Sequence, residues 1–250
     1  YGRYTQKRAD GAVKAAGLLP ASSVASPSFN GLFPDIKGAP SNLQTWAESV
    51  ALPDGPCLAI IEDVTGSGKT EAALVLAARL MAEKRAGGAY FALPTMATAN
   101  AMFDRLGGSY RRMFDPASEP SLVLAHGGGE VNAGFTGSIF ASARSLDEYV
   151  AEKRGDASSA VCAAWIADDR RKAFLAQIGV GTIDQAFVAV LPAKHQALRL
   201  WGLSDRVLIV DEVHAFDAYM GRELERLLEF HAALGGSAIV LSATLPESQR

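Results

Sequence analysis

Six consecutive residues have the types and order that bind phosphate: Thr65-Gly66-Ser67-Gly68-Lys69-Thr70. They follow a short apolar run and precede a helical pattern, so the loop would join a strand to a helix. Its glycines let the backbone curl until the amides and the helix N-terminus point at an anion. Lys69 can then reach the β- and γ-phosphates of a nucleotide, and the Thr70 hydroxyl can hold Mg²⁺. The sequence therefore predicts a site for a nucleoside triphosphate with magnesium.

The loop departs at one position from the pattern GxxxxGK[ST], because Asp63 stands where the first glycine is expected. A carboxylate beside a triphosphate is repulsive unless it points away or is paired. This residue keeps open a non-catalytic interaction module, and the loop alone could also be a glycine-rich surface turn. The order of strand, loop, Lys-Thr and helix favours the phosphate site.

A second group with chemistry is the pair Asp211 and Glu212, at the end of the apolar run Val207–Asp211. In a parallel sheet we expect the end of this run to lie beside the phosphate loop. Asp211 is then placed to hold Mg²⁺, and Glu212 to orient or deprotonate the attacking water. The alternative is that the two carboxylates only cap the helix that follows.

Three further residues extend the expected site. Ser242 and Thr244, in the triplet Ser-Ala-Thr after the last apolar run, could hydrogen-bond to the segment 211–214 and respond to its state. Gln44 lies upstream of the first strand, where its amide could pair with an adenine edge and select the base. Taken alone, each of the three is an ordinary surface or turn residue.

These groups need elements to position them, and the hydrophobic pattern supplies strands and helices in alternation. Short apolar runs predict strands at 57–62, 89–93, 122–126, 178–181, 207–211 and 238–242. Helical patterns cover 69–85, 98–106, 142–153 and 170–177. A last, amphipathic helix has Met220, Leu224, Leu227, Leu228, His231 and Leu234 on one face and Arg222, Glu223, Arg226 and Glu229 on the other. The alternation predicts an α/β fold with a parallel sheet, helices on both faces, and ligands at the carboxyl ends of the strands.

Two segments stand apart from this alternation. Residues 1–45 are interpreted as a linker, because the stretch Leu19–Asn42 is rich in Pro, Ser, Gly and Ala; Phe29 and Leu32-Phe33 within it should pack on a neighbouring surface. Residues 107–165 contain many Gly and Ser and are interpreted as an elaboration on the core domain, which we expect to span 46–250.

Composition bounds the function. The chain has 250 residues, 24 Lys and Arg against 27 Asp and Glu, and a net charge of −3, so any nucleic-acid site must be a local patch. Two cysteines make no disulfide framework or CxxC knuckle, and four scattered histidines, none followed by Asp, give no metal-dependent nuclease of the His-Asp type. Neither a signal peptide nor an 18-residue apolar span is present, which favours a cytoplasmic protein without a membrane partner. The first residue is Tyr rather than Met, which suggests a fragment or a processed chain.

The segments TGSGKT, DEVH and SAT, in this order, resemble those of superfamily 2 helicases, and the resemblance covers 44–246. More narrowly, four stretches resemble the CRISPR-associated helicase–nuclease of type I systems: Ala92–Leu106, Val180–Phe187, Leu191–Leu203 and Val210–Met220. The resemblance implies a RecA-like P-loop domain that binds ATP and Mg²⁺, the first of two such domains. It also implies that this chain lacks the second domain with its arginine finger and an amino-terminal nuclease, whose end would be residues 1–45.

The same resemblance assigns contacts with a single-stranded DNA backbone to two groups of residues, namely Pro94, Thr95 and Asn100, and Gly181, Thr182, Asp184 and Gln185. Small polar side chains at strand ends suit phosphate contacts that do not read sequence. Lys194, Arg199 and Arg206 could add local positive charge, although each is by itself an ordinary solvated residue. His214 would couple the ATP site to the DNA site.

The sequence thus leads to the hypothesis of an ATP-dependent translocase or helicase core that acts with an RNA-guided surveillance complex of the Cascade type. The chain alone is expected to hydrolyse ATP weakly, because the second RecA-like domain is absent. Two alternatives stay open: another superfamily 2 motor on DNA or RNA, and a P-loop nucleotide switch or kinase without motor activity.

Overall fold

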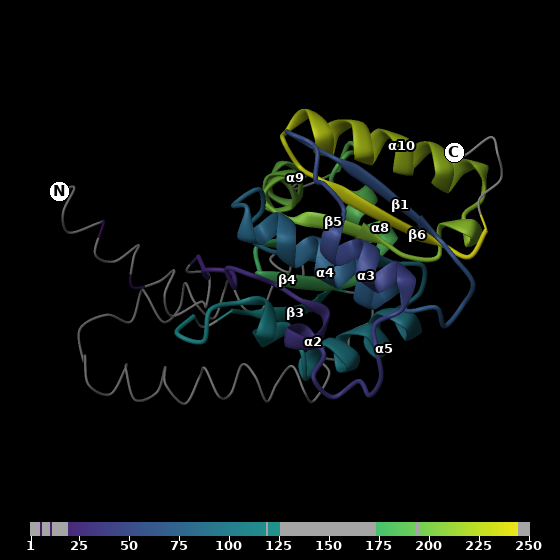
Figure 1. Cartoon of the computed structure of the whole chain (residues 1–250). Helices are drawn as coiled ribbons and strands as arrows, with labels where there is room; N and C mark the ends of the chain where they lie inside the picture. Colours follow the sequence, from purple (N-terminus) through teal and green to yellow (C-terminus); the bar gives the residue numbers. More distant parts are fainter. Residues whose placement is uncertain are drawn as a thin grey trace.

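The computed structural model describes residues 6, 11, 20–118, 120–125, 174–193 and 196–244. Within these residues, six strands form one sheet in the order β1-β6-β5-β2-β4-β3 (Figure 1). The strands are β1 (Leu58–Glu62), β2 (Ala89–Leu93), β3 (Leu122–Ala125), β4 (Ile178–Thr182), β5 (Val207–Val210) and β6 (Ala238–Ser242). All their pairings are parallel, which confirms the predicted α/β fold.

Helices cover both faces of this sheet (Figure 1). They are α2 (Phe29–Leu32), α3 (Asn42–Ser49), α4 (Lys69–Ala82), α5 (Met96–Gly107), α8 (Ile183–Phe187), α9 (Gln196–Ser204) and α10 (Ala218–Ala233), with 3-10 turns η1 (Tyr110–Met113) and η3 (Val213–Ala215). Because side chains alternate along a strand, each buried strand serves two cores. In β2, Phe91 packs with α4 and α5, whereas Tyr90 and Ala92 pack with α8 and α10.

The helix after the phosphate loop, α4, is apolar on all sides because it is covered on all sides. Its residues 71–78 are buried without interruption. The outer face of α4 meets α2 and α3, where Phe29 and Leu32 are almost completely buried, as the sequence predicted. Arg79 of α4 also donates hydrogen bonds of 2.7 Å to the carbonyl oxygens of Ala47 and Val50 at the end of α3. Helix α3 runs across residue 45, and the division of the chain at that residue stays a prediction.

Several expectations need correction. Strand β6 lies between β1 and β5, so the end of β5 is one strand away from the phosphate loop rather than beside it. In α10, Glu223 was expected on the polar face but is buried, because Glu223, Leu227 and His231 form one row at intervals of four that faces the protein interior. Leu234, expected on the buried face, is half exposed because it follows the end of the helix.

Some predicted elements lie outside the described residues. These are His126 at the end of the third predicted strand, the helix at 142–153 and residues 170–173 of the next helix; residues 174–177 form a turn that leads into β4. Most of the expected elaboration at 107–165 also lies outside them, apart from η1 and β3. None of the helices that the structure describes is long and apolar enough to cross a lipid bilayer.

Candidate nucleotide site and its neighbours

The phosphate-binding pattern forms a loop between β1 and α4, at the carboxyl edge of the sheet. Gly66 and Gly68 have φ of 84° and 88°, a left-handed conformation that glycine adopts at little cost. The loop therefore curls before α4 begins at Lys69. The N-terminus of this 14-residue helix, with its unpaired amides, points into the loop and suits a negatively charged group.

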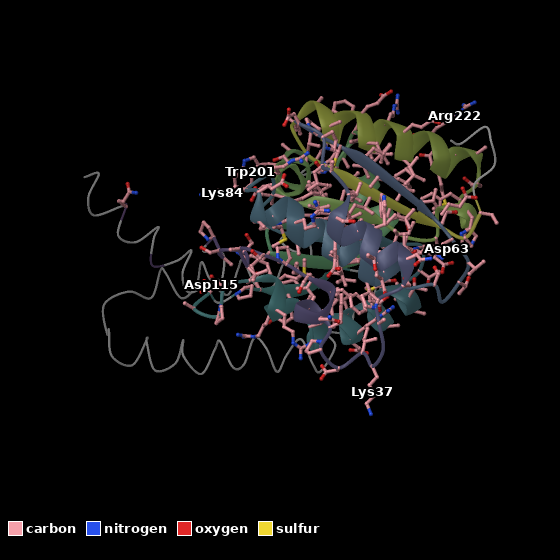
Figure 2. All side chains as sticks on the ribbon, viewed as in Figure 1. Lys37, Asp63, Lys84, Asp115, Trp201 and Arg222 are labelled. Atoms are coloured by element: carbon pink, nitrogen blue, oxygen red, sulfur yellow. The ribbon has the colours of Figure 1, made fainter. Side chains whose placement is uncertain are left out.

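Asp63 does not obstruct this loop. Its carboxylate Oδ1 accepts a hydrogen bond of 2.8 Å from the backbone N–H of Val64. Asp63 is also absent from the residues that line the cavity in front of the loop. Figure 2 shows it at one edge of the molecule, on the side opposite Lys84 and Trp201. The repulsion that the sequence raised as a concern is thus avoided, because the carboxylate is paired with its own turn.

Helix α3 braces the phosphate loop from outside. Ser41 and Gln44 form a capping box: the Gln44 backbone N–H donates to the Ser41 hydroxyl at 3.3 Å, and the Gln44 side-chain Oε1 accepts from the Ser41 backbone N–H at 2.8 Å. The Gln44 amide nitrogen lies 2.2 Å from the place where a β-carbon on Gly68 would be. Gln44 is therefore next to the loop as expected, but its Oε1 is already engaged within α3.

The two carboxylates after β5 face the same space. A cavity of about 650 Å³ is lined by the loop residues Thr65 to Thr70, by Gln44, Asp211, Glu212 and His214, and by Ser242. The Asp211 carboxylate accepts a hydrogen bond of 2.8 Å from the Glu212 backbone N–H. Burial raises the pKa of Asp211, and the Glu212 carboxylate adds to this, whereas that hydrogen bond and the charges of Lys69 and Arg105 lower it. The predicted pair and the predicted loop thus line one cavity.

His214 connects this site to the end of β6. Its Nδ1 accepts a hydrogen bond of 3.3 Å from the Ala243 backbone N–H, and its Nε2 lies 3.7 Å from Glu212 Oε2. The Ser242 hydroxyl donates to the carbonyl oxygen of Thr244 at 2.9 Å. The contact between the two segments is therefore made by the Ala243 backbone rather than by the two hydroxyls that the sequence suggested.

The residues expected to contact DNA lie at or just after the carboxyl ends of β2 and β4, which are neighbours in the sheet. The register pairs Leu93 with Thr182, so Pro94 and Thr95 lie next to Thr182 at the carboxyl edge. Thr95 caps α5, where its hydroxyl accepts from the Thr98 backbone N–H at 3.1 Å and the Thr98 side chain bonds back to the cap. The Asn100 side-chain oxygen is buried without a hydrogen-bond partner in the described part of the chain.

Arg199 of α9 holds the second group of residues expected to contact DNA, through Gln185. Arg199 Nη1 donates hydrogen bonds to the backbone oxygen and the side-chain Oε1 of Gln185, at 3.2 and 2.9 Å. Its guanidinium also lies 5.4 Å from the ring centre of Phe174. Thr182 is buried and Asp184 is exposed, while Gly181 approaches Ala125 and Tyr90 so closely that a β-carbon would lie 2.3 Å from each neighbour's oxygen. Arg199 therefore supports this segment rather than adding a free charge.

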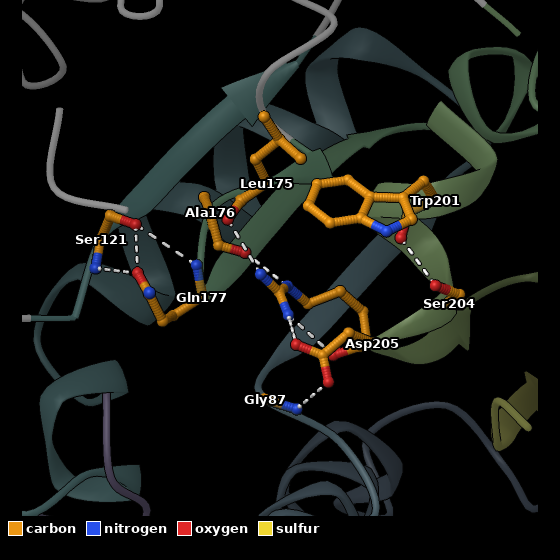
Figure 3. Close-up of polar contacts among 9 residues, drawn as sticks. Gly87, Ser121, Leu175, Ala176, Gln177, Trp201, Ser204 and Asp205 are labelled. Carbon is orange, nitrogen blue, oxygen red and sulfur yellow. Dashed lines mark hydrogen bonds and ion pairs between the residues drawn. The ribbon is translucent and has the colours of Figure 1, made fainter. Parts of the chain in front are cut away.

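Arg206 is neither solvated nor placed for DNA, which corrects the expectation from sequence. It is buried at the start of β5 and donates to the carbonyl oxygens of Ala176 and Leu175, at 2.7 and 2.9 Å, and to the Asp205 carboxylate at 2.6 Å. Figure 3 shows this network around Asp205, Ala176 and Leu175. The position lies at the amino end of β5, far from the carboxyl edge. Lys194 lies outside the described residues.

Among the lining residues that the sequence did not point to are two charged ones, Glu71 and Arg105. Arg105 of α5 donates a hydrogen bond from Nη2 to Oε1 of Glu71, which directly follows Thr70 in the first turn of α4. Both residues line the cavity. Their positions are 34 residues apart, so no local pattern could have paired them.

Comparison with known proteins agrees with this fold. The chain is 45% identical over 211 residues to the CRISPR-associated endonuclease/helicase Cas3 of Escherichia coli (strain K12), a match that covers 84% of the chain and 22% of that protein. It is 44% identical over 226 residues to the Cas3 of Thermus thermophilus, with 89% and 23% covered. No protein-family model matches the sequence.

Solved structures give the same answer. The crystal structure of T. fusca Cas3 with ADP is 36% identical, has a TM-score of 0.75, and covers 95% of this chain and 24% of its own. The ATP complex of the same protein gives a TM-score of 0.73 at 36% identity, again with 95% and 24% covered. A CRISPR RNA-guided surveillance complex in a pre-nicking state gives a TM-score of 0.53 at 31% identity, with 95% and 20% covered. The chain spans about a quarter of the length of these relatives. Sequence and fold together identify it as a member of the CRISPR-associated Cas3 helicase–nuclease family.

Proposed function

We propose that this chain is the nucleotide-binding part of an ATP-driven motor that moves along single-stranded DNA in type I CRISPR interference. The observation that carries the proposal is that the loop of Lys69 and Thr70 and the carboxylates of Asp211 and Glu212 face one cavity. Relatives of this chain are named endonuclease/helicase, and solved relatives hold ADP, ATP or AMPPNP.

The residues of the cavity fit ATP with magnesium. Lys69 and the amides of the loop would bind the phosphates, and Gln44, whose amide nitrogen lies next to Gly68, would contact the base. Magnesium uses few protein ligands because phosphates and water complete its shell, so the Thr70 hydroxyl and the Asp211 carboxylate suffice. Bound there, the ion would neutralise charge on the phosphates. Glu212 would orient the attacking water.

The strand ends next to this cavity would bind the DNA backbone. In the proposal, Pro94, Thr95 and Asn100 form one contact segment, and the residues from Gly181 to Gln185 form the second. His214, which contacts both Glu212 and the end of β6, would link nucleotide state to DNA binding. Such contacts need no strongly basic surface, which suits a chain with a net charge of −3.

The complete protein would need more than this segment. A second RecA-like domain would supply an arginine worth about 10³–10⁵ in rate, so the chain alone would hydrolyse ATP poorly. A nuclease domain would cut the DNA, and an RNA-guided surveillance complex would deliver it. A solved surveillance complex among the structural relatives supports this last partner.

The test compares Lys69→Ala with Lys84→Ala in the complete protein. Both remove one lysine charge, but Lys84 is exposed just after the far end of α4, on the side of the molecule opposite Asp63 (Figure 2). We expect single-stranded DNA to stimulate ATP hydrolysis in the unmodified protein and in Lys84→Ala, and Lys69→Ala to abolish both hydrolysis and ATP-dependent unwinding. Cleavage of single-stranded DNA by the nuclease should survive in both variants.

Other results would point elsewhere. Hydrolysis without any response to nucleic acid would favour a nucleotide switch, and stronger stimulation by RNA would favour an RNA helicase. Unwinding by Lys69→Ala would overturn the role given to Lys69.

A further inference from the structure

An ion pair inside the cavity joins the first turn of α4 to the last turn of α5. Arg105 contributes Nη2 and Glu71 contributes Oε1. The Glu71 side chain is only 9% exposed and directly follows Thr70, whereas the Arg105 side chain is 52% exposed. The two residues therefore meet at the wall of the cavity, one inside the protein and one at its mouth.

The charges make this pair sensitive to what fills the cavity. The helix dipole stabilises a carboxylate in the first turn of a helix. Beside a triphosphate, however, that carboxylate and the phosphates would repel each other unless a cation lay between them. Arg105 supplies that cation. Its charge also reaches Asp211, where it acts together with the charge of Lys69 to stabilise the ionised carboxylate. A triphosphate in the cavity would therefore be a second anionic partner for the Arg105 guanidinium.

Helix α5 connects this ion pair to the proposed DNA segment. Thr98, Ala101 and Arg105 lie along one face of α5 and line the cavity. Thr95 caps the same helix ten residues before Arg105, about 15 Å along its axis. The cavity thus runs along α5 from Thr98 in its first turn to Arg105 in its last turn, and Thr95, which caps the helix, lies just after the end of β2.

We propose that the ion pair between Glu71 and Arg105 links nucleotide binding in the cavity to single-stranded DNA binding at the start of α5. Arg105 is a positioning residue in this proposal: nucleotide weakens its bond to Glu71, and the position of α5 changes with it. The coupling is reciprocal, so DNA at Thr95 changes nucleotide affinity by the same factor. The inference rests on the proposed function.

The test measures the affinity of the complete protein for fluorescent oligothymidylate with and without AMPPNP and magnesium. In the unmodified protein we expect the two dissociation constants to differ by at least about 5-fold, the lower end of typical allosteric coupling. Glu71→Gln removes the charge at constant shape and should bring the ratio close to 1. Arg105→Lys keeps the charge but loses the fork geometry, and should give an intermediate ratio. The double variant should resemble Glu71→Gln, because the two residues act as a unit.

Glu83→Gln is the matched control, since it removes the carboxylate of the ion pair between Glu83 and Arg85 just after the end of α4. It should keep the ratio of the unmodified protein. The inference would be overturned if Glu71→Gln folds and also keeps the ratio of the unmodified protein. If Glu71→Gln does not fold, an unchanged ratio in Arg105→Lys would overturn the inference. A ratio of 1 in the unmodified protein would overturn it too, whereas a protein that binds neither probe would contradict the proposed function itself.

Discussion

The ammonium group of Lys69 donates hydrogen bonds to the backbone carbonyl oxygens of Asp63 and Val64, at 2.5 and 2.8 Å. The lysine expected to bind phosphate is thus held by the backbone at the start of its own loop. The side chain of Asp63 takes no part in this contact, because it accepts from the Val64 N–H. Asp63 therefore contributes its backbone to the loop, and that contribution does not depend on residue type.

This relationship predicts that Asp63→Ala keeps nucleotide binding. The substitution removes one side-chain hydrogen bond at an accessible turn, which should lower the free energy of unfolding by about 0.5–1.5 kcal/mol. Isothermal titration with AMPPNP and magnesium should give an affinity within about 2-fold of the unmodified protein, far less than one lost charge-assisted contact. Asp115→Ala is the control, because Asp115 Oδ1 accepts an equivalent 2.8 Å bond from the Ala117 N–H on a distant surface. A tenfold loss of affinity in Asp63→Ala alone would show that its carboxylate takes part in binding.

Gly68→Ala, unlike Asp63→Ala, should weaken nucleotide binding. Gly68 has φ of 88°, and a β-carbon there would lie 2.2 Å from the Gln44 amide nitrogen. The left-handed conformation costs about 1–2 kcal/mol for alanine, and Gln44 must also move away from the loop. We expect at least a tenfold weaker affinity for ATP, since the loop can no longer keep its curl.

Gly55→Ala is the control for Gly68→Ala, because it introduces the same kind of backbone strain outside the loop. Gly55 also has positive φ, 77°, but no atom of the residues that the structure describes lies within 4 Å of its β-carbon position. It should therefore show the loss of stability without the loss of ATP affinity. Equal affinities in the two variants would mean that neither the left-handed conformation of Gly68 nor its contact with Gln44 matters for nucleotide binding.

The strands and the loop before α4 could be predicted because their signals are local. The apolar runs 89–93 and 238–242 coincide with β2 and β6, and the loop before α4 lies in one stretch of sequence. What failed depends on contacts between distant segments. The insertion of β6 between β1 and β5, the burial of Arg206 against the carbonyl of Ala176, and the pairing of Arg105 with Glu71 have no local pattern.

A buried histidine predicts a pH dependence of stability. His231 of α10 packs against Gly236, and its Nε2 lies 3.1 Å from the Ser237 carbonyl oxygen. Burial lowers the pKa of His231, while hydrogen bonding to the backbone of Ser237 and Arg206 opposes this. Below the ordinary histidine pKa of about 6.5, the unfolded chain takes up a proton that the folded chain does not, so stability falls as pH decreases.

His231→Gln should remove this part of the pH dependence. The difference in free energy of unfolding between the unmodified protein and the variant should shrink from pH 8 to pH 5.5, by no more than about 1.4 kcal/mol per pH unit. Urea denaturation at a series of pH values measures it. A difference that stays constant with pH would show that His231 gains its proton equally in the folded and unfolded chain.

Asp211→Asn should stabilise the nucleotide-free protein while it removes magnesium-dependent binding. Burial raises the pKa of Asp211, so the ionised carboxylate is disfavoured in the fold, and stability falls as pH rises through the range in which Asp211 ionises. Asparagine avoids that cost, with an expected gain of about 0.5–2 kcal/mol in the free energy of thermal unfolding at neutral pH.

The same variant tests magnesium binding. AMPPNP should raise the melting temperature of the unmodified protein more with magnesium than without it, and that difference should vanish in Asp211→Asn. Asp54→Asn, at an exposed turn, should change neither quantity. If the variant kept the magnesium-dependent shift, the metal would have to be held by groups other than the Asp211 carboxylate.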